Sequence, residues 1–148
     1  MIALRQAPAM AAALLVAVAT PASAAPPVDW NAVADIEAIE IVTLDADGNP
    51  RETSVPMAVW KGHGYVRTGR SGWLADVERD PDVRVRIAGA EHLLRAVRVR
   101  DSETYEGVTQ AFREQEGLWD AFLGLFRGLR PVPTILRLDP RTTIAPAP

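Results

Sequence analysis

A short glycine-bounded loop near the middle of the chain holds the residues best suited to chemistry. The stretch 67–73 reads RTGRSGW and lies between a strand-like segment and a helix-like segment. It offers two guanidinium groups, a hydroxyl group and the free backbone N–H groups of a helix start, which together can bind one anion. Phosphate is the anion that this combination fits best. We therefore predict an anion site formed by Arg67, Arg70, Ser71 and the backbone of the 69–72 loop.

A second interpretation of the same loop needs no ligand. Ser71 is a good N-cap for the helix that follows, and Arg67 and Arg70 could simply be solvated. Trp73, in the first helical turn, could anchor the helix to the sheet or face a bound aromatic group. Thr68 could be an ordinary strand residue. The sequence leaves both interpretations open.

Composition excludes several other kinds of site. The chain carries a formal charge of −3 and gives no electrostatic reason to bind nucleic acid. With no cysteine and two histidines, a metal site is not expected. His63 lies in a glycine-rich turn and His92 lacks a nucleophile at a suitable spacing, so no catalytic triad is predicted and the catalytic residues stay unassigned.

The N-terminal residues have the pattern of an export signal. Arg5 is the only charge before Asp29, an apolar run covers 10–19, and Ala22-Ser23-Ala24 is a small-x-small cleavage pattern. The run is short for a membrane span, although an uncleaved anchor is the alternative. We expect a secretory signal over 1–24, a periplasmic or secreted mature protein, and no membrane attachment after cleavage.

Hydrophobic periodicity then predicts one domain of short strands. A leader with a short helix covers 25–38 and a split β-barrel domain covers 39–141, followed by a disordered tail over 142–148. Val83, Val85 and Ile87 alternate with arginines, and Val97 and Val99 are expected to form the apolar face of the next strand. Strands are expected over 39–44, 51–60, 65–68, 83–87, around 97–100, and over 134–138.

Two helices interrupt these strands. The first follows the third strand and stops at Asp80-Pro81, because proline cannot continue a helix. The second begins at Ser102 and carries an apolar stripe that should pack against the barrel. Its members recur at steps of three and four: Tyr105, Val108, Phe112, Gln115, Trp119, Phe122, Phe126 and Leu129. The expected fold is thus mainly β with helices (α+β): a six-stranded antiparallel split barrel with a short helix after strand three and a long helix before the last strand.

The order of these segments resembles the FMN-binding split-barrel superfamily, which includes pyridoxamine-phosphate oxidases and deazaflavin-dependent reductases. The resemblance rests on "YVRT" leading into a loop and short helix, on "RDPDVRVRIAG", and on the closing "TILRLDPR". It covers 39–141. Such proteins commonly form homodimers and hold FMN or a deazaflavin in a groove between subunits.

The resemblance implies a particular set of cofactor contacts. The cofactor phosphate would lie near Arg67, Thr68, Arg70, Ser71 and Gly72, with Trp73 at the helix start. The second strand, including Ser54, Val55 and Pro56, would run beside the flavin ring. The closing LRLDPR lacks the Arg-Leu-His-type motif of pyridoxamine oxidases, and the 69–73 loop is shorter than that of deazaflavin reductases.

Two functions of different classes follow. The first is an exported flavin-dependent oxidoreductase acting on a small molecule, with the cofactor supplying the chemistry. The second is a non-catalytic module that binds a small anion or haem in the same groove, or that simply dimerises.

Overall fold

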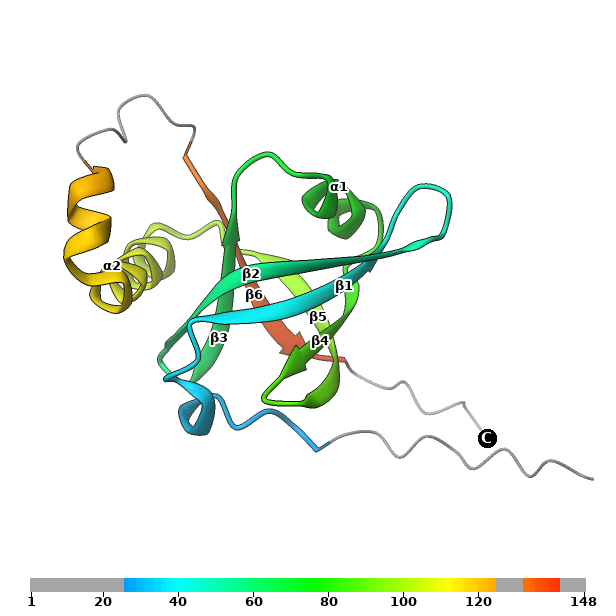
Figure 1. Ribbon diagram of the computed structural model, residues 1–148, viewed down its shortest axis with the longest axis horizontal. Helices are drawn as coiled ribbons and strands as arrows, with labels where there is room; N and C mark the ends of the chain where they lie inside the picture. The colour runs from blue at the N-terminus through cyan, green and yellow to red at the C-terminus, as the bar shows by residue number, and fades with distance from the viewer. Residues whose placement is uncertain (1–25, 125–131, 142–148) are drawn as a thin grey trace, which may run out of the picture.

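Six antiparallel strands close into a barrel (Figure 1). This computed structural model describes residues 26–124 and 132–141, with side chains left out for 116–124. The strands follow one another around the barrel in the order β1-β2-β3-β6-β5-β4, so β6 lies between β3 and β5. The strands are β1 (Ala38–Leu44), β2 (Pro50–Trp60), β3 (His63–Thr68), β4 (Asp82–Ile87), β5 (Ala90–Arg98) and β6 (Thr134–Pro140). The predicted six-stranded barrel is confirmed.

Three helical segments accompany the barrel at the predicted places. A single 3₁₀ turn, η1 (Asn31–Val33), precedes β1; α1 (Gly72–Arg79) follows β3; and α2 (Ser102–Gly124) precedes β6. In Figure 1, α1 lies across one end of the barrel and α2 lies along its side. None of the helices in the described part of the chain is long and apolar enough to span a bilayer.

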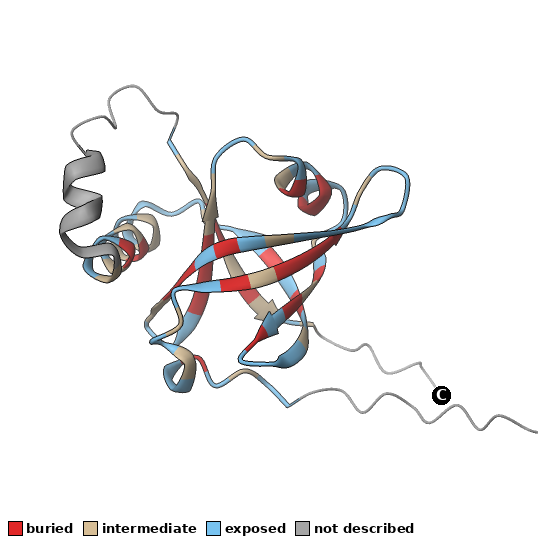
Figure 2. Ribbon diagram, in the orientation of Figure 1, coloured by how far each residue is buried: buried red, intermediate tan, exposed pale blue. Residues whose placement is uncertain are grey.

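The barrel interior is filled by alternate residues from every strand (Figure 2). Ile41, Met57, Val66 and Val85 are fully buried there. Trp73 and Val77 of α1 and Trp30 beside η1 belong to the same core. At Gly64 an added Cβ would lie 2.2 Å from the Trp30 ring, so glycine is required for that approach. The interior is therefore a packed core.

A second core joins α2 to the outer surface of the barrel. Val108 and Phe112 of α2 pack against Ala58, Tyr65 and Ile135 of β2, β3 and β6. The helix comes so close to β2 that a Cβ at Gly107 would lie 2.3 Å from the Trp60 ring. The predicted packing of the apolar stripe is confirmed for Tyr105, Val108 and Phe112. The side chains of Trp119, Phe122, Phe126 and Leu129 lie outside the described residues.

The predicted orientation of β5 was wrong. Leu94 and Ala96 face the core, whereas Val97 is exposed and Val99 packs with the outer cluster beyond the strand end. Pairing with β4 places Leu94 opposite Val83 and fixes this orientation. Shifting a strand's side-chain alternation by one residue exchanges its two faces. The expected signal segment and C-terminal tail lie outside the described residues.

Candidate cofactor site

The entrance to α1 gathers the hydroxyl groups of the predicted anion site. Ser71 has extended backbone angles and its Oγ accepts a hydrogen bond of 3.3 Å from the Leu74 N–H, which is N-cap geometry. The Oγ atoms of Ser71 and Thr68 are 3.0 Å apart and share a hydrogen bond. Thr68 ends β3, so the turn between strand and helix is short. Thr68, Ser71 and Gly72 therefore lie together.

Strand β2 contributes a cationic side chain that the sequence analysis missed. Arg51, near the start of β2, lies against the first residue of α1: a Cβ added at Gly72 would be 2.7 Å from Arg51 Nη1. Its Nε donates to Asp76 Oδ2 at 2.8 Å. Among the described residues, its two Nη groups have no acceptor, and the side chain is nearly half exposed. Arg51 thus brings a guanidinium group to the helix entrance.

Asp76 holds that arginine in place from inside the fold. Its side chain is 3% exposed and also accepts from Thr43 Oγ1 at 2.9 Å and, more distantly, from Arg79. Burial alone would raise the pKa of Asp76, but the hydrogen bonds from Thr43 and Arg51 and the Arg51 charge together hold it below its ordinary value. The carboxylate is therefore ionised and fully hydrogen-bonded. It ties β1, β2 and α1 together.

The two arginines of the predicted anion site lie apart: Arg67 contacts α2, and Arg70 lies in the loop before α1. Arg67 points from the outer face of β3 toward α2, with its guanidinium carbon 4.6 Å from the centre of the Phe112 ring. That distance is a cation–π contact. Arg70 is exposed in the loop before α1. Arg70 therefore lies beside the cluster of Thr68, Ser71 and Gly72, whereas Arg67 is engaged at the α2 contact.

The remaining predicted contacts divide between the core and the surface. Trp73 and Val55 are buried in the barrel core, so their side chains serve packing in this structure. Ser54 and Pro56 are exposed on β2, opposite Glu40 and Ala38 of β1. Contact of these four residues with a cofactor stays a prediction.

The donor set at the α1 entrance fits a phosphate group. The Nη groups of Arg51, the N–H groups of α1 that precede Leu74, and the exposed Arg70 next to Ser71 in the chain could donate to it. The hydroxyls of Thr68 and Ser71 bond to each other and to the Gly69 carbonyl, and would have to turn to donate to a phosphate. We call these four side chains together with Gly72 the entrance cluster. No group of three metal-ligating side chains occurs within the described ranges.

Comparisons with known proteins support the fold. No family model matches the chain, and no curated protein matches it in sequence. The solved structure of the conserved hypothetical protein Rv2991 from Mycobacterium tuberculosis is similar, with a TM-score of 0.60 and 17% identity over 75% of this chain and 78% of that one.

Two other similar structures have functional names. The heme storage protein HutZ from Vibrio cholerae has a TM-score of 0.52 and 19% identity over 72% of this chain and 82% of its own. An F420-H2-dependent reductase, FDR-A, has a TM-score of 0.52 and 15% identity over 70% of this chain and 95% of its own. At these identities the likeness shows the fold alone.

Proposed function

We propose that this chain is a flavin-binding split-barrel protein that holds the phosphate of FMN or of a deazaflavin at the entrance cluster. The observation that carries the proposal is the position of Arg51 on Gly72, beside the paired hydroxyls of Thr68 and Ser71. Similarity in fold to an F420-H2-dependent reductase supports a cofactor of this class. The finer proposal is a small-molecule oxidoreductase.

The chain's own groups would bind and orient, and a bound flavin would supply the hydride chemistry. Ser71 and Thr68 would donate hydroxyl hydrogen bonds, while Arg51 and Arg70 would neutralise the phosphate charge. The exposed outer residues of β2, Ser54 and Pro56, would lie beside the ring. This arrangement needs no acid–base pair among the described residues.

Titration with FMN tests the proposal. We expect the purified protein to bind FMN, seen as quenching of flavin fluorescence and a shift of its visible absorbance. Arg70→Ala should weaken binding by about tenfold, since a hydrogen bond to a charged group contributes about 1.5–3 kcal/mol. Absence of binding at about 100 μM FMN, where affinities of about −5.5 kcal/mol are detectable, would contradict the proposal.

A matched pair of substitutions at Ser71 separates capping from anion binding. Aspartate is as good an N-cap as serine, so Ser71→Asp should keep the helix and the thermal stability. Its negative charge should nevertheless abolish FMN binding by repulsion. Ser71→Gly, which costs a few tenths of a kcal/mol as a cap, should bind FMN more weakly than the unmodified protein and better than Ser71→Asp. Equal FMN affinity of Ser71→Asp and the unmodified protein would leave Ser71 as a cap only.

A haem-binding function is the second candidate, because the fold is shared with a heme storage protein. Haem carries carboxylates, which the same cationic cluster could bind. Titration with hemin distinguishes the two: a strong new visible band with hemin and no response to FMN would favour haem.

Export and dimerisation complete the proposal. The signal pattern over 1–24 supports a periplasmic or secreted protein, and N-terminal sequencing of the mature protein would test it. The family resemblance supports a homodimer. Native mass spectrometry would report subunit number and any bound cofactor together.

A further inference from the structure

Asp76 is the only buried charged side chain among the residues whose side chains the structure describes. Thr43 on β1 is buried beside it and donates to Asp76 Oδ2 at 2.9 Å. Burying a carboxylate costs free energy, and well-packed apolar residues often stabilise a core as well as a buried ion pair does. Stability alone therefore does not explain an aspartate at this position.

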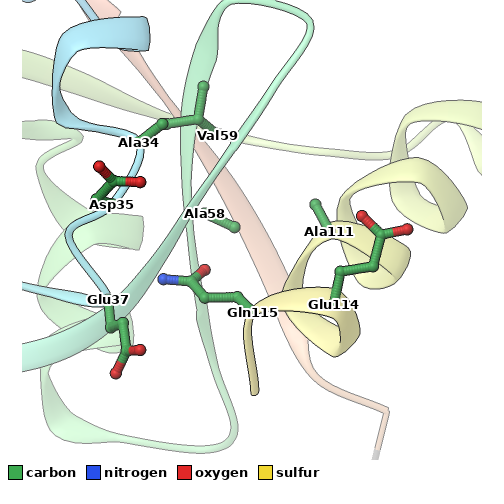
Figure 3. Close-up of a pocket in the computed structure, with 8 residues that line it drawn as sticks. All are labelled: Ala34, Asp35, Glu37, Ala58, Val59, Ala111, Glu114 and Gln115. Carbon is green, nitrogen blue, oxygen red and sulfur yellow. The ribbon is translucent and has the colours of Figure 1, made fainter. Parts of the chain in front are cut away.

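The carboxylates at the surface hollow between α2 and β2 are arranged differently (Figure 3). Asp35, Glu37 and Glu114 line this hollow, but all three are exposed and they point away from one another. Glu114 already accepts a hydrogen bond from the Gln110 amide at 3.2 Å. These three groups do not converge on one point, whereas the oxygens of Asp76 are directed at particular donors.

Asp76 holds Arg51 by one nitrogen and leaves the other two at the helix entrance. Arg51 Nε donates to Asp76 Oδ2 at 2.8 Å, and Arg51 Nη1 lies 2.7 Å from the place of a Cβ at Gly72. The guanidinium group is planar, so fixing Nε also fixes the directions in which the Nη groups donate. Thr43 orients the carboxylate from β1, and the carboxylate orients the arginine.

We propose that Asp76 is a positioning residue, which raises the affinity of the entrance cluster for a phosphate group by holding Arg51 in its donating orientation. This role rests on the function proposed above for that cluster. Arg51 is nearly half exposed, so without Asp76 its long side chain would lose rotamer freedom when an anion binds. Ordering one such side chain weakens binding by about two- to tenfold.

The sign of the effect separates positioning from simple charge. Asp76 is negative, so its charge alone repels a phosphate, and removing that charge would strengthen anion binding. As a positioning residue it has the opposite effect, because its removal releases Arg51. Asp76→Asn nearly keeps the shape of the side chain and removes the charge, so the direction of the change in affinity decides between the two.

Titration with inorganic phosphate at constant ionic strength measures this affinity in the purified protein, through the backbone amide NMR signal of Gly72. We expect Asp76→Asn to weaken phosphate binding by about two- to tenfold. Arg51→Ala should weaken it by about tenfold or more, since it removes hydrogen bonds from a charged donor. Adding Asp76→Asn to Arg51→Ala should cause no further loss, because Asp76 acts through the arginine.

Arg79→Gln is the matched control. Arg79 Nη2 also contacts Asp76, at 3.4 Å, but Arg79 is the last residue of α1 and its Nη1 donates to the Leu44 carbonyl. Its substitution should change the phosphate affinity by less than about twofold, since salt at about 0.1 M screens a charge at the far end of the helix. Equal losses in Arg79→Gln and Asp76→Asn would show a general loosening of α1 and overturn the proposal.

Two measurements decide the matter even where Asp76→Asn does not fold. Hydrogen exchange at Arg51 Nε–H, followed by NMR without any ligand, should be slower than at the exposed Arg70. Arg51→Lys keeps the charge but has a single ammonium group in place of the planar fork, so phosphate binding should weaken by about tenfold. Equal exchange at the two arginines, or unchanged affinity in Arg51→Lys, would overturn the proposal.

The remaining outcomes separate this role from flavin binding. Tighter phosphate binding in Asp76→Asn, a further loss in the Arg51→Ala background, or no response of Gly72 to phosphate would each overturn the positioning role. FMN binding that is insensitive to Asp76→Asn would contradict this role and leave the proposed function standing. The expected phosphate results without any FMN binding would support the positioning role and contradict the flavin.

Discussion

Asp76 is the residue whose charge state depends most on the fold. It is an almost fully buried carboxylate, and its three donors come from β1, β2 and α1 itself. Removing a partner from such a group leaves an unsatisfied polar atom, which is more harmful than the bond is favourable. The same carboxylate positions Arg51 at the helix entrance, so it connects stability with the proposed phosphate site.

The pH dependence of stability should report this residue. The pKa of Asp76 is lowered in the folded protein, so its contribution to the free energy of unfolding is present above its unfolded pKa of 3.8. That contribution is lost as the pH falls below 3.8 and through the folded value. We predict that Asp76→Asn lowers the urea midpoint at pH 7 and that its difference from the unmodified protein shrinks below about pH 4.

Asp47→Asn provides the control for this measurement. Asp47 is exposed at the tip of the β1–β2 hairpin, and its side chain makes no hydrogen bond among the described residues. Its substitution should leave the urea midpoint nearly unchanged at every pH. A deficit in Asp76→Asn that is the same at pH 7 and at pH 3 would mean that the amide loses shape complementarity rather than charge.

The role of a residue could be predicted from the sequence where that role depends on its neighbours in the chain. Ser71 lies at the junction of a strand and a helix, and its N-cap role was one of the two interpretations. Arg51 could not be found in this way, because 21 positions separate it from Gly72 in the printed sequence. Gly72 itself was a weak signal of this contact, because the absence of a side chain leaves room for the guanidinium group of a residue on another element.

At the scale of elements, α2 is positioned by one close approach. Gly107 lies over the Trp60 ring, and Trp60 in turn meets Tyr65 edge-on at 6.4 Å between ring centres. The Trp60 ring is rigid, so an added methyl group must push the helix away from β2. The packing of Val108 and Phe112 behind it would loosen as well.

We predict that Gly107→Ala destabilises the protein although alanine favours helix formation. The helix-propensity gain is about 1 kcal/mol, whereas overpacking costs about 1–3 kcal/mol and spreads to the neighbouring contacts, so a net loss of up to about 2 kcal/mol in unfolding free energy is expected. Urea denaturation would measure it. The exposed neighbour substitution Glu106→Ala should be within about 0.5 kcal/mol of neutral.

A double variant identifies the cause. Replacing the large ring in Trp60→Leu should relieve the clash. The double variant should therefore lose less unfolding free energy than the sum of the losses in the two single variants. Strict additivity of Gly107→Ala and Trp60→Leu would show that the two residues are not coupled, and would contradict the close approach as the source of the effect.

The end of α1 followed a local signal, whereas the bounds and the orientation of β5 did not: this strand was expected around 97–100 and covers Ala90–Arg98. Asp80-Pro81 ended α1 as predicted, because proline excludes helical continuation there. In β5 the sequence LLRAVRV offers two alternations, and the larger valines suggested the wrong one. The inward position is instead filled by the small Ala96, which tertiary pairing with β4 and β6 selects. Strand register is a long-range property.

At the scale of the whole molecule, the packed interior determines where a ligand can bind. Trp30 and Trp73 both belong to the continuous core that runs through the barrel. If a flavin binds as proposed, its ring would lie on the outer surface, beside exposed residues such as Ser54 and Pro56. One barrel surface alone would leave one side of such a ring in water, and a second copy of the chain could cover it. The sequence could indicate this arrangement through family resemblance alone.

A site shared between two copies makes cofactor binding depend on protein concentration. If FMN lies between subunits, it binds the dimer better than the monomer and shifts the equilibrium toward the dimer by mass action. We predict that the apparent FMN affinity rises as protein concentration increases through the dimer dissociation range, and that FMN increases the dimer fraction in sedimentation velocity. Arg70→Ala should shift both effects to about tenfold higher FMN concentration and leave the dimer constant of the FMN-free protein unchanged. An FMN affinity independent of protein concentration in that range would place the whole site within one copy.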